Sequence, residues 1–218
     1  SNNTAVGFDA LGANTDGDSN VAVGEQALDA NTTGDNNTAI GRDACGQQTT
    51  ASNNTAVGTN ALYTSTGSNN TSIGAGSMFA NTTGEQNTAV GSNALDANTT
   101  GSNNTAIGYD SLGANTTANA NTAVGRRSLR LNTTGSSNSA VGYQALENNT
   151  TGTNNTAIGY NALIANTTAH ANTALGMDAL YTNTTGSANV AVGKDALRLS
   201  NSSNNTALGQ SALNVLTT

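Results

Sequence analysis

Five aspartates recur at one place in a repeated sequence word, two residues after a glycine: Asp9, Asp43, Asp110, Asp178 and Asp195. A column of carboxylates suits Ca²⁺, which prefers oxygen ligands. In other repeats this place holds a residue such as Asn, Gln, Gly or Arg, and the Gly-rich nonapeptide pattern of calcium-binding repeats is absent. We therefore predict solvated turn residues at this place and no metal site.

The single histidine and the single cysteine are the other residues that nucleophilic or metal chemistry would use. His170 stands between Ala169 and Ala171, and no recurring set of partners for a triad or a metal cluster lies near it in the sequence. Cys45 takes the place of a leucine that recurs in other repeats, which indicates a buried apolar thiol. Polysaccharide-cleaving solenoids need clustered carboxylates on broader coils. The sequence thus predicts no catalytic residue, no cofactor and no enzyme.

The basic and aromatic residues leave two interpretations open. Arg126, Arg127 and Arg130 form the one basic cluster, which is either a plain charged surface or a partner for acidic turns, such as those of Asp96 and Glu147, on another subunit. The aromatic residues recur in two columns, one directly after the glycine and one after the leucine: Tyr109, Tyr143 and Tyr160, then Tyr63, Phe79 and Tyr181. These rings are either contacts between chains or scattered surface residues.

The composition excludes several classes of function. Only 9% of the 218 residues are charged, 3% are aromatic, and the formal net charge is −7. A weakly acidic chain with six basic residues is a poor ligand for nucleic acid. No apolar run is long enough to span a bilayer. Such a composition fits a disordered low-complexity tract or a repeat fold, and periodicity decides between them.

The periodicity is strong. Thirteen words of the "NTAVG" type end in a glycine that we call the repeat glycine, and ten of the twelve spacings between these glycines are 17 residues, the other two being 16. The repeat glycines are Gly7, Gly24, Gly41, Gly58, Gly74, Gly91, Gly108, Gly125, Gly142, Gly159, Gly176, Gly193 and Gly209. The chain is therefore predicted to be one repeat domain over residues 1–218, without clear capping repeats.

Each repeat contains two short apolar words, "NTAVG" and "AL", joined by polar turns. In the first word the side chains alternate as in a strand, so Thr105 and Ile107 share one face and Ala106 lies on the other. Two strands and two turns in about 17 residues predict an all-β fold, a parallel β-solenoid of thirteen coils whose equivalent residues stack at the strand spacing of ~4.8 Å. The Ala-rich opposite face is predicted to support lateral association.

Two columns follow from this stacking. The Asn four residues before each repeat glycine is predicted to form a ladder of side-chain amides: Asn3, Asn20, Asn37, Asn54, Asn70, Asn87, Asn104, Asn121, Asn138, Asn155, Asn172, Asn189 and Asn205. The β-branched or Leu residue directly before each repeat glycine is predicted to form the core column: Val6, Val23, Ile40, Val57, Ile73, Val90, Ile107, Val124, Val141, Ile158, Leu175, Val192 and Leu208.

The two ends are in phase with the repeat. If a second copy followed Thr218, its Asn3 would continue the Asn column at a spacing of 16 residues, which also occurs inside the chain. Asn3, Thr4, Thr217 and Thr218 are therefore predicted to make an end-to-end contact in a filament. The alternative, equally weighted, is that the sequence is a window on a longer repeat.

The words resemble a known family. Asn20-Val21-Ala22-Val23-Gly24 and its twelve counterparts resemble the head repeats of trimeric autotransporter adhesins (YadA-like or Hep/Hag heads), and the resemblance covers the whole chain. It implies a left-handed β-roll that trimerises side by side outside the cell. Similar words also occur in shafts of bacterial and phage fibres. The coil here is longer than in the adhesin heads, and the neck, stalk and membrane anchor are not present in this sequence.

These patterns favour a structural protein: an extracellular, cell-surface or virion fibre of stacked coils that associates with itself, laterally or head to tail. The alternative is an adhesin head or fibre-shaft module that binds a glycan or a host surface. Ice recognition is disfavoured, because adjacent Thr-Thr side chains would point in opposite directions in a strand. Neither nucleic acid nor membrane insertion is expected.

Overall fold

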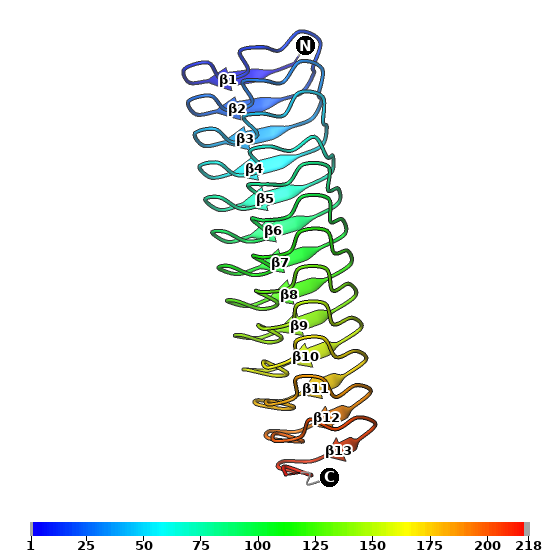
Figure 1. Ribbon diagram of the computed structural model, residues 1–218. Coiled ribbons are helices and arrows are strands. Elements are labelled where there is room, and N and C mark those ends of the chain that lie inside the picture. Colours follow the sequence, from blue (N-terminus) through cyan, green and yellow to red (C-terminus); the bar gives the residue numbers. More distant parts are fainter. Residues whose placement is uncertain (1, 216–218) are drawn as a thin grey trace. The chain divides into compact units, whose positions relative to one another are not determined.

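The computed structural model describes residues 2–215 and has two compact units, one ending at Tyr109 and the other beginning at Asp110. Each unit forms the predicted all-β parallel β-solenoid, in which every repeat is one coil (Figure 1). The strands of the first unit are β1 (Thr4–Val6), β2 (Val21–Val23), β3 (Thr38–Ile40), β4 (Thr55–Val57), β5 (Thr71–Ile73), β6 (Thr88–Val90) and β7 (Thr105–Ile107). Those of the second are β8 (Thr122–Val124), β9 (Ser139–Val141), β10 (Thr156–Ile158), β11 (Thr173–Leu175), β12 (Val190–Val192) and β13 (Thr206–Leu208).

Within each unit, every strand pairs in parallel with the next strand in the chain. Between β3 and β4, for example, Thr38 lies opposite Thr55 and Ala39 opposite Ala56. The Thr38 N–H donates to the carbonyl of Asn54 at 2.8 Å, and the Gly58 N–H donates to the carbonyl of Ile40 at 2.8 Å. The sequence repeat thus becomes a register in which each residue stacks on its own equivalent.

From β2 to β13 the strands bury their middle residue, and the side chains on either side of it are half-buried or exposed. Ala39 and Ala56 are fully buried, whereas Ile40 is 41% exposed and Ile158 is 40% exposed. The prediction that the column from Val6 to Leu208 forms the core is therefore wrong, because none of those thirteen residues is buried. Alternation separates the two faces of a strand without saying which of them lies inside. The structure places the small Ala side chains in the interior of the coil.

The predicted second strand of each coil is also absent from the described residues, because the "AL" word forms a tight turn. After Gly41, the residues Asp43 and Cys45 have φ values of 56° and 50°, in the left-handed region. Residues in that conformation cannot continue an extended strand. The same pattern of positive φ recurs two and four residues after the repeat glycines along the chain.

This backbone explains two residue columns. Except in the first and last coils, the fourth residue after the repeat glycine points inward and is fully buried, as for Leu28, Met78 and Leu95. A left-handed φ is costly for β-branched residues, so this apolar column holds Leu, Met or Cys and never Val or Ile. Two residues after the glycine, the same conformation favours Asp and Asn, which accounts for the aspartates without a metal.

The repeat glycine is needed for its own reason. Gly24 has a φ of +134°, and a Cβ on it would lie 2.6 Å from the carbonyl carbon and oxygen of Gly41 in the next coil. Backbones of successive coils approach at this corner more closely than any side chain allows. The glycine column is therefore a steric requirement of the stack.

The left-handed leucine column gives a first test. We expect Leu95→Ile to lower stability by about 1–3 kcal/mol, because the β-branched residue must adopt the left-handed φ of 54°. Leu95→Met is the control, since Met78 already occupies this column with a φ of 46°. Urea unfolding followed by far-UV circular dichroism measures both. Equal unfolding midpoints for the two variants would contradict the explanation.

Candidate functional site

The Asn residues that precede the strands form a continuous buried ladder in each unit. The Asn37 N–H donates to Asn20 Oδ1 at 2.9 Å, and the Asn54 N–H donates to Asn37 Oδ1 at 3.0 Å. Each amide nitrogen also reaches across the coil, as Asn37 Nδ2 does when it donates to the carbonyl of Ala51 at 2.9 Å. In the second unit the same contacts run from Asn121 to Asn205. This ladder ties each coil to its neighbour and also ties the two sides of one coil together.

A second amide ladder lies opposite the first. Seven residues after the repeat glycine, Asn149 Nδ2 donates to Asn132 Oδ1 at 2.8 Å and to the carbonyl of Gly152 at 3.0 Å. Asn166 continues it by donating to Asn149 Oδ1 at 2.7 Å. These residues are fully buried. Sequence reasoning missed this ladder, although the recurrence of "NTT" at a fixed place was the signal for it.

The two shortened coils change this second ladder in the same way. Where the spacing drops to 16 residues, Ser65 and Ser200 replace the Asn and one residue of the following turn is missing. The Ser65 hydroxyl accepts from the Gly67 N–H at 3.1 Å and from Asn81 Nδ2 at 3.0 Å. A shorter side chain thus compensates for a shorter turn, and the register of the strands is kept.

A third ladder lies on the surface, in the column two residues before the Asn of the first ladder. Side-chain acceptors in this column receive a backbone N–H from the preceding coil, as Ser136 Oγ receives that of Asn119 at 3.1 Å. His170 belongs to this column, and its Nδ1 accepts the Thr153 N–H at 3.0 Å. His170 is exposed and is a hydrogen-bond acceptor between coils, a role that its sequence context did not reveal.

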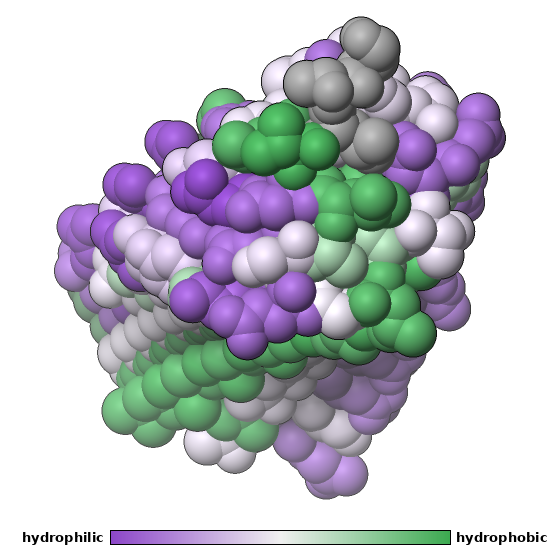
Figure 2. Space-filling view, turned by 90° about the horizontal axis from the view of Figure 1, so that it is seen from below, coloured by the Kyte–Doolittle hydropathy of each residue, from purple (hydrophilic) through white to green (hydrophobic). Residues whose placement is uncertain are grey.

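The first and third side chains of every strand form what we call the outer strand face. In the first unit it consists of Thr4, Val6, Val21, Val23, Thr38, Ile40, Thr55, Val57, Thr71, Ile73, Thr88, Val90, Thr105 and Ile107. In the second unit it consists of Thr122, Val124, Ser139, Val141, Thr156, Ile158, Thr173, Leu175, Val190, Val192, Thr206 and Leu208. Among residues 2–215, no strand contains a charged residue. Hydrophobic side chains gather in rows on the outside of the coils (Figure 2).

This face reverses the prediction about lateral association. The Ala face, expected to meet other chains, fills the inside of the coil, and the β-branched face is the one that meets solvent. Thr is half-buried at most strands, while Ile73, Ile107 and Leu175 are about as exposed as Ile40. A periodic apolar surface of this kind typically marks a contact site.

Paired threonines form a second repetitive surface. In five successive coils of the second unit the turn reads Thr-Thr: 116–117, 133–134, 150–151, 167–168 and 184–185. The first Thr donates its hydroxyl to the next coil, as Thr150 does to the Thr167 carbonyl at 3.0 Å. The second Thr is exposed in all five coils. The pair lies in a bend rather than in a strand, so the alternation that disfavoured ice recognition does not apply to it.

Four of the aromatic residues stack in two pairs, each between successive coils. The rings of Tyr143 and Tyr160 lie 5.3 Å apart and nearly parallel, and those of Tyr63 and Phe79 lie 5.4 Å apart. The Arg126 guanidinium lies over the Tyr143 ring at 5.6 Å and donates to the Tyr143 hydroxyl at 3.1 Å. Because one ring face covers the next, these pairs offer mainly their edges to a ligand.

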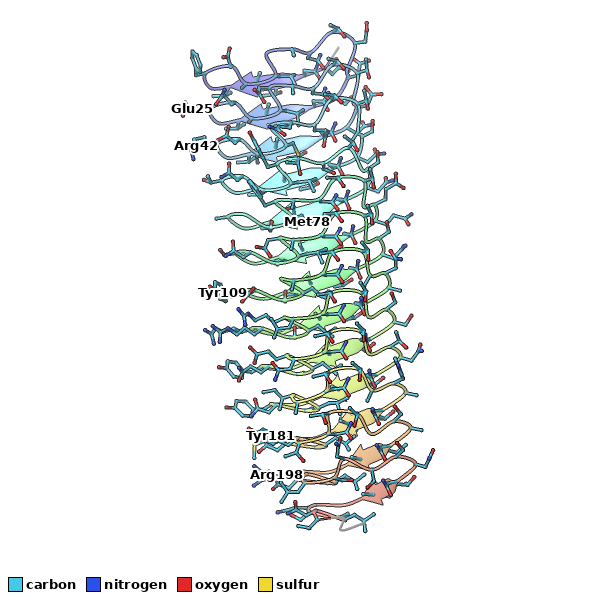
Figure 3. All side chains as sticks on the ribbon, viewed as in Figure 1. Glu25, Arg42, Met78, Tyr109, Tyr181 and Arg198 are labelled. Carbon is cyan, nitrogen blue, oxygen red and sulfur yellow. The ribbon has the colours of Figure 1, made fainter. Side chains whose placement is uncertain are left out.

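Several charged side chains pair within the chain. Arg130 Nε lies 2.6 Å from Asp110 Oδ2, and Arg198 Nε lies 3.3 Å from Asp195 Oδ1. In Figure 3, Glu25 and Arg42 project outward from one edge of the first unit, whereas Met78 lies within its coil. Pairing with acidic side chains of the same chain accounts for Arg130 without a second subunit.

The residues that could bind a metal ion do not cluster in the described part of the chain. No three His, Cys, Asp or Glu side chains among residues 2–215 lie close enough to hold a metal ion. Burial raises the pKa of Asp29, with the nearby carboxylates of Asp43 and Asp9 adding to the effect. Over the same residues, no helix is long and apolar enough to cross a membrane.

Part of the predicted end-to-end contact lies in the described structure. Asn3 Nδ2 donates to the Gly17 carbonyl at 2.7 Å, and Thr4 pairs with Val21. Thr217 and Thr218 lie outside the described residues. The end-to-end contact stays a prediction.

The first Asn ladder can be tested by single substitutions. We expect Asn54→Ala to lower stability by about 2–5 kcal/mol, because it leaves the buried Asn70 N–H and the buried Gln48 Oε1 without their partner. Asn53→Ala is the matched control, since Asn53 is exposed and Ala120 occupies the same column elsewhere. Urea unfolding of both variants measures the difference. A loss of similar size in both variants would show that the ladder contributes little.

The buried thiol gives a test with a defined pH dependence. Burial raises the pKa of Cys45 from 9.0 to about 12. We therefore expect iodoacetamide to modify Cys45 only after the protein unfolds. Stability should fall as the pH rises from about 9 to about 12, because the unfolded thiol ionises first. Rapid alkylation of the folded protein, or a Cys45→Leu variant with the same fall, would contradict this assignment.

No protein-family model matches the chain, and no curated protein matches it either.

Proposed function

We propose that the protein is a structural protein whose copies associate side by side through the outer strand face to build a fibre or filament. The single observation that carries this proposal is the row of exposed Val, Ile and Leu side chains on an otherwise neutral face. Burial of apolar surface is the main force in such association. A location outside the cell or on a virion belongs to the same proposal and rests on the resemblance of the repeat words.

Two properties of the face favour a second copy as its partner. Each copy carries a net charge of −7, so copies repel one another. This electrostatic repulsion is smallest where two copies meet through a face without charges. A second copy also has the same spacing of ~4.8 Å between coils, so the side chains of one copy can fit between those of the other at every coil. A smooth or irregular partner would match this face at few coils. Three copies, as in the adhesin heads, are one arrangement that satisfies both properties.

The amide ladders support the proposal that the solenoid is a structural element, because they hold successive coils together. Each coil is held to the next by backbone bonds and by buried amides in two columns. The apolar core alone is thin, because it consists of small side chains in the strand and directly before the leucine, together with one Leu column. Lateral contacts through the outer strand face would cover the exposed β-branched side chains and add apolar burial.

A matched pair of double variants tests the proposal. Ile73→Glu with Val90→Glu places two carboxylates on the outer strand face, and Ala75→Glu with Ser92→Glu places them in the same coils, two residues later. The second column already holds Glu25 and is exposed at both positions. We expect the first variant to weaken self-association at least tenfold and the second to leave it unchanged, as measured by sedimentation velocity and electron microscopy.

Either of two results would refute the proposal. One is a native protein that stays monomeric at all accessible concentrations. The other is an equal effect of the two double variants, since this would trace association to general charge rather than to the outer strand face. Circular dichroism of each variant must show the native strand content for the comparison to count.

The alternative is a module that binds a glycan or a host surface, and one observation favours it. The second Thr of the paired threonines is exposed and recurs in successive coils, whereas the exposed column after the repeat glycine varies among Tyr, Arg, Met, Lys and others. Thr151→Lys changes this surface, and Ile164→Lys is its control, because Arg130 and Arg198 occupy the latter column. Loss of glycan-array binding in the first variant alone would support the alternative.

A further inference from the structure

The surface ladder contains one acceptor that differs chemically from the rest. Seven other contacts of this type use a hydroxyl or a carboxylate, supplied by Asp35, Ser52, Ser68, Ser102, Ser136, Ser187 and Ser203. At His170 the acceptor is the ring nitrogen Nδ1, which receives the Thr153 N–H at 3.0 Å. The Thr153 hydroxyl lies at the same distance from this nitrogen.

The contact requires a neutral ring. A neutral imidazole has one nitrogen with a free lone pair, whereas both nitrogens of the protonated ring carry hydrogen. A ring flip cannot restore the acceptor after protonation, because either nitrogen then presents an N–H. The positive ring also faces the positive end of the Thr153 N–H dipole. A serine in the same place keeps its acceptor at any pH.

The surroundings of His170 contain no charge that would mask this effect. The turn segments packed on it are residues 148–156 of the preceding coil and 182–190 of the following coil, and neither contains an ionisable side chain. The same holds for its own segment, residues 165–173, apart from His170 itself. The backbone N–H of His170 makes a separate hydrogen bond, in which it donates to Ser187 Oγ at 3.1 Å. Protonation thus affects the contact with the preceding coil and not the contact with the following one.

We propose that His170 makes one junction of the solenoid, between the coil of Thr153 and its own coil, sensitive to acid. On protonation the Thr153 N–H loses its partner and the turn at this junction opens more often. The contacts of the surface ladder that use a serine hydroxyl do not respond. The junction between these two coils is therefore less stable in acid than the other junctions, whether or not copies associate.

Amide hydrogen exchange of Thr153, measured by NMR from about pH 8 to about pH 5, tests this directly. The reference is His170→Ser, which restores the common residue of the column and cancels the intrinsic pH dependence of exchange. We expect the ratio of exchange rates, native over His170→Ser, to be close to one at the upper pH and to rise about threefold to tenfold at the lower pH. The Asn119 amide, held by Ser136 Oγ, should show no such rise.

A second variant separates the lost acceptor from other effects. His170→Leu has no acceptor at any pH, so its Thr153 amide should exchange rapidly over the whole range. A ratio for the native protein that does not change with pH would overturn the proposal. Identical exchange in His170→Leu and His170→Ser would also overturn it, because the contact would then contribute nothing to the junction.

Discussion

The buried amide at the start of each strand is the interaction on which the rest of the fold depends. Asn54 accepts an N–H from the next coil, and it donates both to Gln48 and to the carbonyl of Gly67 on the far side of its coil. A buried amide with an unmade bond costs more than a bond contributes. Each coil can therefore sit on its neighbour in one register only, and the sequence must repeat because the contacts do.

The narrow interior that these amides line decides what faces solvent. Two Asn columns, Ala, and a left-handed Leu column fill it, and little volume is left for β-branched side chains. The strand alternation then sends Thr and Val or Ile outward. An apolar, uncharged and periodic outer face follows from this narrow interior of Asn, Ala and Leu. The exposed Val and Ile side chains are the physical basis of the proposed contact between copies.

The sequence alone was sufficient for the fold class and for the position of the first Asn column, because both follow from the spacing of the repeat. It was not sufficient to choose the buried face of the strand. Val6 and its equivalents are larger and more apolar than Ala, so they were expected inside, and only the size of the coil reverses that order. The "AL" word was expected as a strand, because an apolar pair such as Ala44-Cys45 does not show its backbone φ. The role of His170 depends on a neighbour 17 residues away, Thr153, which becomes visible only once the coils are stacked.

The most direct test of this account is cryo-electron microscopy of the purified protein at a resolution that separates the coils. The account predicts assemblies in which neighbouring solenoids meet along the outer strand face, with continuous side-chain density between the Val and Ile rows of adjacent copies. Solenoids that stay single, or that pack through the edge carrying Glu25 and Arg42 while the outer strand face remains in contact with water, would contradict it.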